Sequence, residues 1–338
     1  MRSMTGSEAN PASETPAASR PVARSALKRI LEKPEINVLI GLIVLCVGLS
    51  IASPYFMTLR NIVNVLRQFS LIAILAIGQA LIIITGGIDL SVGSLVGFTA
   101  CFGAWIGKSG ASPLVMLVAI LGIGAIAGFI NGSLVTRVGI APFIATLGMM
   151  SIARGFSLLM TMGVPIHVNK TWISVFGGGY IGIVPVSVIV MLLIVVSGYI
   201  FAKNTVLGRN IYAIGNSEKA AKLSGIRVER VKVMVFTITG MLAGVCGLIL
   251  VGQLEGADAF YGNGYELDVI AAAVIGGISL SGGEGNLIGI IVGAALMGVL
   301  KNAFVLLAVP GYWQTVAIGV VIIGAVSLDS LRRKRHVK

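Results

Sequence analysis

The chain has 338 residues, of which 56% are hydrophobic and 11% are charged, and its mean hydropathy is +0.98. Soluble domains carry roughly 25% charged residues, so this composition excludes a soluble globular protein and predicts an integral membrane protein. The net charge of +12 does not indicate nucleic-acid binding, because 18 of the 25 Lys and Arg residues lie in three polar segments that flank apolar runs, namely 1–35, 203–232 and 329–338.

The N-terminal segment, residues 1–33, is rich in Ala, Ser, Pro and charge. It lacks the short apolar core and small-residue cleavage site of a signal peptide. We therefore predict a disordered cytoplasmic tail over these residues. A transmembrane domain is expected over residues 34–330, and a basic cytoplasmic tail over residues 331–338.

Ten apolar stretches approach the roughly 20 residues with which a helix crosses the hydrocarbon core. They cover residues 36–53, 69–85, 91–107, 113–136, 143–163, 183–202, 233–253, 265–280, 287–307 and 312–328. These runs are continuous rather than alternating, which favours helices over a β-barrel. The predicted fold class is therefore an all-α, polytopic membrane protein with about ten transmembrane helices, some of them broken or re-entrant.

The positions of the basic segments fit one topology. If the N-terminus is inside, ten crossings return the C-terminus inside, and the loop after the sixth crossing, 203–232, also lies inside. All three basic segments then face the cytoplasm, as the positive-inside rule requires.

The stretch GGIDLSVG, residues 86–93, interrupts the apolar pattern between two predicted spans. Irregular backbone at membrane depth is tolerated only where it is buried in protein or lines a wet cavity. An aspartate at the centre of a span costs about 2.5–3.5 kcal/mol on insertion scales. Two interpretations stay open: a broken segment on a solute pathway, or a cytoplasmic turn in which Asp89 caps the next span.

A second stretch, GGISLSGG at residues 276–283, matches the first in six of eight places. Transporters are often built from repeats whose broken helices meet at the substrate path, so an internal repeat is one interpretation. Chance similarity between Gly-, Ser- and Leu-rich segments is the other.

Charged residues near the predicted spans are few. Glu266 and Asp268 begin the eighth stretch, where the helix dipole favours carboxylates, so they serve either the helix or a pathway. No Lys or Arg is their evident partner in the sequence. Arg154 lies either at the end of a span or in an ion pair inside the bundle.

Residues 203–232 form the longest polar stretch between spans. Within it, Asn216 or Ser217 can cap a helix, Glu218 suits a first turn, and Gly225 can end the helix. We predict a helix of about two turns at the cytoplasmic face. It is either a rigid contact for another subunit or part of a plain connecting loop.

Enzyme signatures do not accompany these features. The segment GAWIGKS, residues 103–109, looks like a phosphate loop, but three residues rather than four separate its glycines, and it closes an apolar run. The sequence has no HExxH and no Cys/His cluster. We therefore expect no catalytic residues, no metal ligands and no ATP hydrolysis by this chain.

Four motifs in order resemble the membrane permease subunits of bacterial ABC importers for monosaccharides, the ribose-type family. They are GGIDLSVGS (86–94), APFIATLGMMSIARG (141–155), GRNIYAIGNSEKAAKLSGI (208–226) and GYELDVIAAAVIGGISLSGGEG (264–285). The resemblance runs from about residue 36 to 328. It implies location in the bacterial inner membrane, a cassette ATPase partner that binds ATP and Mg, a periplasmic sugar-binding protein, and a second permease copy, identical or related.

The resemblance also implies that the segment EKAAKLSG is the coupling helix that contacts the ATPase. The implied coupling residues are Asn216, Glu218, Ala220, Ala221, Leu223, Ser224 and Gly225. The family implies no high-affinity sugar site on the permease, so candidates for the translocation pathway are chosen on polarity and glycine content. They are Gln79, Gly86, Gly87, Asp89, Ser91, Asn131, Phe143, Glu266, Gly276 and Gly277.

The predicted function is the membrane path of an ATP-driven importer for a monosaccharide such as ribose or xylose. The alternative is an ion-coupled secondary transporter of a small polar solute, which the broken-helix echo and Asp89 would suit. The sequence determines neither the sugar nor whether the two permeases of the pair are identical.

Overall fold

The computed structural model describes residues 34–336, and these fold almost entirely into helices. The helices within the predicted apolar stretches are α2 (Pro34–Ala52), α3 (Leu59–Ile84), α4 (Val92–Lys108), α5 (Pro113–Ser133), α6 (Pro142–Thr161), α8 (Val186–Asn204), α11 (Val228–Leu254), α12 (Tyr265–Ile275), α13 (Leu287–Leu306) and α14 (Gly311–His336). The helical membrane architecture that the composition predicts is thereby confirmed. The predicted tail over 1–33 lies outside the described residues.

The remaining elements are short. Helix α5 continues into a π-helical turn, η1 (Leu134–Val138), and the segment after α6 holds η2 (Trp172–Ser174) and α7 (Val175–Gly178). Two antiparallel pairs of two-residue strands follow: β1 (Ile166–His167) pairs with β4 (Gly256–Ala257), and β2 (Tyr180–Ile181) with β3 (Val184–Pro185). Two further helices, α9 (Val206–Asn216) and α10 (Glu218–Leu223), lie between α8 and α11.

A helix lies in each of the ten predicted apolar stretches. Among the described residues, six helices are long and apolar enough to cross a membrane: Leu59–Ile84, Pro113–Val138, Pro142–Thr161, Val186–Asn204, Val228–Leu254 and Leu287–Leu306. Helix α12 has only 11 residues. At a rise of about 1.5 Å per residue it spans roughly half of the ~30 Å hydrocarbon core. The count of ten crossings therefore stays a prediction.

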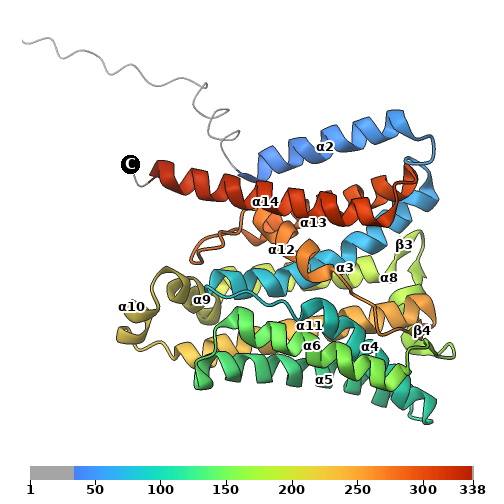
Figure 1. Cartoon of the computed structure of the whole chain (residues 1–338), viewed down its shortest axis with the longest axis horizontal. Helices are drawn as coiled ribbons and strands as arrows, with labels where there is room; N and C mark the ends of the chain where they lie inside the picture. Colours follow the sequence, from blue (N-terminus) through green and yellow to red (C-terminus); the bar gives the residue numbers. More distant parts are fainter. Residues whose placement is uncertain (1–33, 337–338) are drawn as a thin grey trace, which may run out of the picture.

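The long helices lie roughly along one axis of the molecule (Figure 1). Helices α9 and α10 and the end of α14 lie at one end of this axis, and strands β3 and β4 lie at the other (Figure 1). Helix α14 continues through residues 331–336, which the sequence analysis assigns to a basic tail. The loop 203–232 and the C-terminal end of α14 thus share one end of the molecule, as the predicted topology requires.

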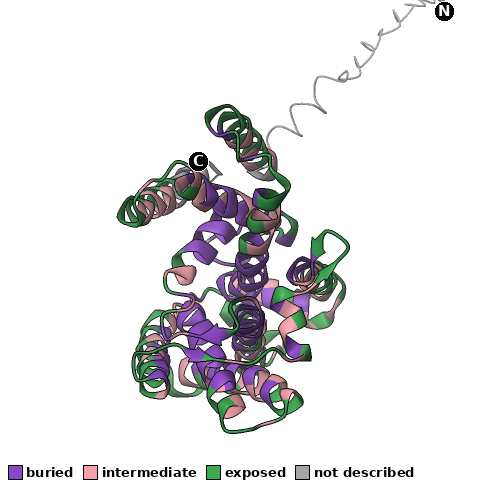
Figure 2. Ribbon diagram, turned by 90° about the vertical axis from the view of Figure 1, so that its right-hand side faces the viewer, coloured by how far each residue is buried: buried purple, intermediate pink, exposed green. Residues whose placement is uncertain are grey.

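Helix α3 forms the centre of the core. Every residue from Phe69 to Ile84 is buried. A helix that is apolar on all faces must be surrounded by other helices, and α3 packs against α8, α11, α12 and α13. Figure 2 shows the buried residues gathered in the middle of the bundle and the exposed ones on the outward faces.

Glycines bring α5 and α11 into backbone contact. A Cβ atom on Gly128 would lie about 3.0 Å from the Cα of Thr237 and against the carbonyl group of Phe236. A Cβ atom on Gly240 would likewise meet backbone atoms of Gly124 and Gly128. The small-xxx-small spacing in the sequence therefore marks a helix–helix contact, as such spacing does in membrane bundles.

We predict that Gly128→Ala destabilises the protein and that the matched variant Gly122→Ala does not. A side chain at position 128 would have to separate α5 from α11, at a cost of about 1–3 kcal/mol. Gly122 lies in the same helix with no atom within 4 Å of an added Cβ, so alanine there adds up to about 1 kcal/mol of helix propensity. Thermal unfolding of the purified chain in detergent would compare the two. Equal melting temperatures would contradict the contact.

Candidate functional site

Helix α3 ends in a turn that contains a left-handed glycine. Gly86 has φ +81, and its N–H and that of Gly87 donate to the carbonyls of Ile83 (2.8 Å) and Ile82 (3.0 Å). This is the Schellman pattern, in which a left-handed residue ends a helix. Non-helical backbone then runs to Ser91, and α4 begins at Val92; both residues are fully buried. The broken segment predicted at 86–93 is present.

The carboxylate of Asp89 is fully buried. Its Oδ1 accepts hydrogen bonds from the backbone N–H (2.7 Å) and the hydroxyl (2.6 Å) of Ser91. The Ser91 oxygen in turn accepts from Nδ2 of Asn131, on α5, at 2.9 Å. Asp89 therefore shapes the turn that starts α4, and it does so from a fully buried position. The pathway and the cytoplasmic turn both stay predictions.

The backbone of the same segment is held from two further helices. In the amide orientation that matches donors with acceptors, Gln79 of α3 donates to the Asp89 carbonyl (3.1 Å) and accepts from the Asp89 N–H (3.2 Å). The Thr146 hydroxyl of α6 accepts from the N–H of Leu90 at 3.1 Å. Irregular backbone at membrane depth must be satisfied within the protein, and these side chains do so.

Two hydrogen-bond acceptors in this cluster have no donor. Within residues 34–336, Oδ2 of Asp89 and Oδ1 of Asn131 are buried and have no hydrogen-bond partner. Buried polar atoms are normally satisfied, so such atoms mark a place for water, a proton or a ligand donor. The cluster can therefore accept additional hydrogen bonds without losing those that hold the segment.

The second Gly-rich stretch ends a helix in the same way, but its left-handed glycine is the second glycine of the stretch rather than the first. After α12, Gly277 has φ +93, and the N–H groups of Gly277 and Ile278 donate to the carbonyls of Val274 and Ala273, both at 3.0 Å. The shift means that the two stretches are not superimposable residue by residue. The internal repeat stays a prediction.

The two breaks contact each other. The N–H of Gly283 donates to the carbonyl of Ile84, the last residue of α3, at 2.9 Å. A Cβ atom on Gly282 would lie 2.9 Å from the same carbonyl oxygen and 3.1 Å from the nitrogen of Gly86. The similar stretches, about 190 residues apart in sequence, therefore form one junction in the fold.

A second irregular segment, residues 258–264, reaches the interior from the end where β4 lies (Figure 1). Its carbonyls pack on the glycine face of α4, because a Cβ atom on Gly97 would lie 2.7 Å from the Tyr261 carbonyl oxygen. Arg154 of α6 donates to the carbonyl of Ala259 and lies 5.7 Å from the ring centroid of Phe260. The sequence analysis left the partner of Arg154 open, and it is this segment.

Glu266 lies between the N-termini of two helices. It is in the first turn of α12, and its Oε2 occupies the space beside Gly93, in the first turn of α4. Helix N-termini stabilise carboxylates, and the Arg154 guanidinium is close enough for its charge to act on Glu266. The structural role that the sequence analysis offered for Glu266 therefore has a geometric basis.

Asp268 has a basic partner that the sequence did not reveal. Its buried carboxylate pairs with the Nζ of Lys301, on α13, and the same Nζ lies 5.2 Å from the ring centroid of Tyr265. Lys301 opens onto a cavity of about 250 Å³ that is also lined by Gln68 and Gln314. In the sequence, a lone lysine within an apolar stretch indicated that Lys301 needs a partner. The packing of α12 on α13 identifies that partner as Asp268.

The cytoplasmic helix predicted near residue 217 is present. Ser217 caps α10 by accepting from the N–H of Ala220 at 3.2 Å, and Gly225 follows its end with φ +80. The sequence analysis did not predict α9, although Leu207, Ile211 and Ile214 recur at helical spacing and pack against the core. The loop 203–232 is thus two short helices rather than one.

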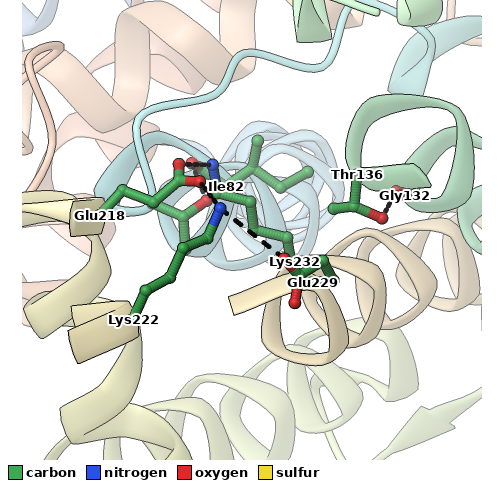
Figure 3. A network of polar contacts seen from close by, with 8 residues as sticks. Ile82, Gly132, Thr136, Glu218, Lys222, Glu229 and Lys232 are labelled. Carbon is green, nitrogen blue, oxygen red and sulfur yellow. Dashed lines mark hydrogen bonds and ion pairs between the residues drawn. The ribbon is translucent and has the colours of Figure 1, made fainter. Parts of the chain in front are cut away.

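Ion pairs connect α10 to the start of α11 (Figure 3). Glu218 pairs with Lys222 at 3.0 Å and with Lys232 at 2.7 Å, and Lys222 also lies 3.7 Å from Glu229. Hydrogen bonds from Lys232 and Lys222 hold the pKa of Glu218 below its usual value. The pairs therefore persist until acid protonates Glu218.

One side chain of α10 projects outward from this fastened helix. Leu223 is 90% exposed, whereas Ala221 is buried. A large apolar side chain so exposed on a fixed helix is available to a partner surface.

Helix α9 reaches the junction of the two breaks. A Cβ atom on Gly215 would fall against the carbonyl of Ile84 and the N–H of Gly283, so the backbones are in direct contact. The hydroxyl of Tyr212 donates to the carbonyl of Gly285 at 3.0 Å. Helix α9 is therefore in direct contact with both broken segments.

The structure brings together four of the candidate pathway residues. Gln79, Asp89, Ser91 and Asn131 form one buried cluster, to which Thr146 adds a contact that the sequence analysis missed. Gly86 and Gly87 lie on the same segment, where Gly87 is buried and Gly86 is exposed. Glu266 lies beyond this cluster, beside Gly93. Gly276 packs on Gly289 of α13, and the side chain of Phe143 is exposed on α6.

Comparison with known proteins gives a consistent result. The family model described as branched-chain amino acid transport system / permease component matches residues 61–326. The ribose import permease protein of Escherichia coli strain K12 is 41% identical over 299 residues, covering 87% of this chain and 93% of the relative. The ribose import permease protein of Bacillus subtilis strain 168 is 42% identical over 292 residues, covering 86% and 91%.

A third relative is named for a hexose. The D-allose transport system permease protein of Escherichia coli strain K12 is 35% identical over 289 residues, covering 84% of this chain and 88% of the relative. No solved structure matches the chain.

We predict that Asp89→Ala destabilises the protein by about 1–3 kcal/mol, because the N–H of Ser91 loses its buried acceptor. Asp89→Asn keeps an oxygen at the same position and should cost less. Thermal unfolding of the purified chain in detergent would separate the two variants. If Asp89→Ala melts at the wild-type temperature, the turn at α4 does not depend on the carboxylate.

A double-mutant cycle tests the buried ion pair. Lys301→Met leaves the carboxylate of Asp268 buried without a partner. We therefore expect this variant to lower the free energy of unfolding by about 3–5 kcal/mol. The double variant Asp268→Asn with Lys301→Met removes both charges and should recover much of the loss. A double variant no more stable than Lys301→Met alone would show that the two groups do not interact.

Proposed function

The chain belongs to the family of permease components of ABC importers, and from this premise we propose that it forms the membrane path by which a monosaccharide enters a bacterial cell. The observation that carries the proposal is the contact of α9 with both broken segments at Ile84 and Gly283. Such a contact connects a cytoplasmic surface to a buried polar cluster. An ATP-driven importer needs that connection, and an ion-coupled secondary transporter does not.

The solute class is inferred from relatives and from chemistry. The relatives are named for ribose and D-allose, whereas the family description names branched-chain amino acids. The buried cluster offers amide and hydroxyl groups and two unused acceptors, at Asp89 and Asn131. Hydroxyl groups of a sugar can donate to such acceptors. The ammonium group of an amino acid can do so as well, so the choice of a sugar rests on the names of the relatives.

Helix α10 is the proposed contact for a cassette ATPase, which would bind the ATP and Mg. Its ion pairs with α11 hold it fixed, and Leu223 is exposed on it. The exposed residues named for coupling in the sequence analysis, Asn216, Glu218, Ala220, Leu223, Ser224 and Gly225, all lie on or beside α10. Movement of the cassette would then be transmitted through α9 to the junction of the breaks.

The remaining parts of the assembly follow from the same premise. A periplasmic binding protein would deliver the sugar to the end where β3 and β4 lie, and a second permease copy would complete the path. In this arrangement both termini are cytoplasmic, the chain crosses the inner membrane ten times, and the basic loop 203–232 faces the cassette. Charge distribution supports that orientation.

We predict that Leu223→Asp abolishes ATP-dependent uptake while the chain remains in the membrane. Removing an apolar anchor from the centre of an interface typically costs 2 kcal/mol or more, about a 30-fold loss of affinity. Leu223→Met keeps an apolar side chain of similar size and is the matched control. The measurements are uptake of labelled ribose into cells and the cassette subunit recovered with a tagged chain.

Three outcomes are informative. Loss of both uptake and cassette recovery in Leu223→Asp alone supports α10 as the coupling contact. Normal uptake in that variant rules out α10 in this role. A wild-type chain that is recovered without a cassette and carries sugar in liposomes without ATP would overturn the importer proposal itself.

A further inference from the structure

A groove of about 620 Å³ lies between the C-terminal end of α5 and the start of α11. Three arginines line it: Arg137 of η1, Arg227 at the N-cap of α11, and Arg230 in the first turn of α11. All three are exposed. The groove lies at the end of the molecule that carries α10, and it does not belong to the buried cluster around Asp89.

The positive charge of this groove is not balanced by the protein. Across residues 34–336, no ion pair joins any of the three arginines to a carboxylate. Glu229 also lines the groove, and its carboxylate lies 3.7 Å from the Nζ of Lys222, so the lining carries three positive charges and one negative charge. Clustered guanidinium groups in excess over carboxylates favour phosphate, with which they make bidentate hydrogen bonds.

Apart from Glu229 and Thr237, the rest of the groove is apolar, and it follows α11 into the membrane-spanning part. Its lining extends from Arg227 to Ile238 and includes Met234 of α11 and Phe129 of α5. At a rise of about 1.5 Å per residue, Arg227 and Ile238 are roughly 16 Å apart along the axis of α11. This is about the thickness of one hydrocarbon leaflet, half of the ~30 Å core.

We propose that this groove binds one anionic phospholipid of the cytoplasmic leaflet, with its phosphate on the arginines and an acyl chain along Phe129, Met234 and Ile238. A polar anion would use only the arginine end, and a soluble protein would not reach Ile238. Basic pockets at the cytoplasmic ends of membrane helices suit the headgroups of anionic lipids. Arg137 also lies 5.8 Å from the ring centroid of Phe129, which joins the charged end to the apolar wall.

Native mass spectrometry of the full chain in mild detergent tests this site. The chain is titrated with phosphatidylglycerol, with phosphatidylcholine of the same acyl chains, and with inorganic phosphate. We expect phosphatidylglycerol to bind more tightly than phosphatidylcholine. One arginine near the surface contributes about a 5-fold effect and two about 30-fold, so Arg137→Gln with Arg230→Gln should weaken phosphatidylglycerol about 30-fold and leave phosphatidylcholine unchanged.

Two further variants keep the test independent of folding. Lys219→Gln removes one positive charge from the exposed surface of α10, outside the groove, and should leave phosphatidylglycerol binding at the wild-type level. The single variant Arg137→Gln alters one exposed side chain and should weaken binding about 5-fold. Equal phosphatidylglycerol binding by wild type and Arg137→Gln would overturn the site.

Two results would assign the arginines to another ligand. Displacement of phosphatidylglycerol by millimolar inorganic phosphate would indicate a soluble anion. Unchanged phosphatidylglycerol binding together with loss of a co-purified cassette subunit in the double variant would indicate a protein contact. Either result overturns the lipid site, and neither bears on the coupling role proposed for Leu223.

Discussion

Buried backbone groups that lie outside a helix must be bonded inside the protein, and this constraint organises the centre of the molecule. The segment between α3 and α4 meets it with side chains from three helices, Gln79, Asn131 and Thr146, and with Asp89 of its own. Because each partner comes from a different helix, the positions of α3, α5 and α6 are set by one polar cluster. A shift of any of them would break bonds that neither lipid nor water could replace.

Close glycine contacts bring the two breaks and α9 into direct backbone contact. The junction between the two breaks is made by backbone atoms of Ile84, Gly282 and Gly283, and α9 approaches it through Gly215. Without side chains between them, a displacement of α9 acts directly on both segments. Larger residues would absorb such a displacement by changing rotamer, since packed side chains have several staggered states.

The two acidic side chains of α12 lie close to basic groups or helix N-termini. Asp268 is paired with Lys301, and Glu266 lies between the N-termini of α4 and α12 near Arg154. Isolated charges would cost several kcal/mol each in such surroundings. The Asp268–Lys301 pair connects α12 to α13, and Glu266 contacts the first turn of α4, so α12 is held to two helices although it has only 11 residues.

The sequence by itself determined the membrane class, the ten apolar stretches, the break at Gly86 and the capped helix at Ser217, because hydropathy, glycine and capping act over a few neighbouring residues. It pointed to Asp89, Ser91 and Asn131 as polar residues at depth, but it did not pair them. Only the tertiary structure decided that Lys301 meets Asp268, that Thr146 joins the cluster, and that two similar stretches about 190 residues apart touch. Those contacts depend on how helices pack, and helix packing is set by the whole bundle rather than by local spacing.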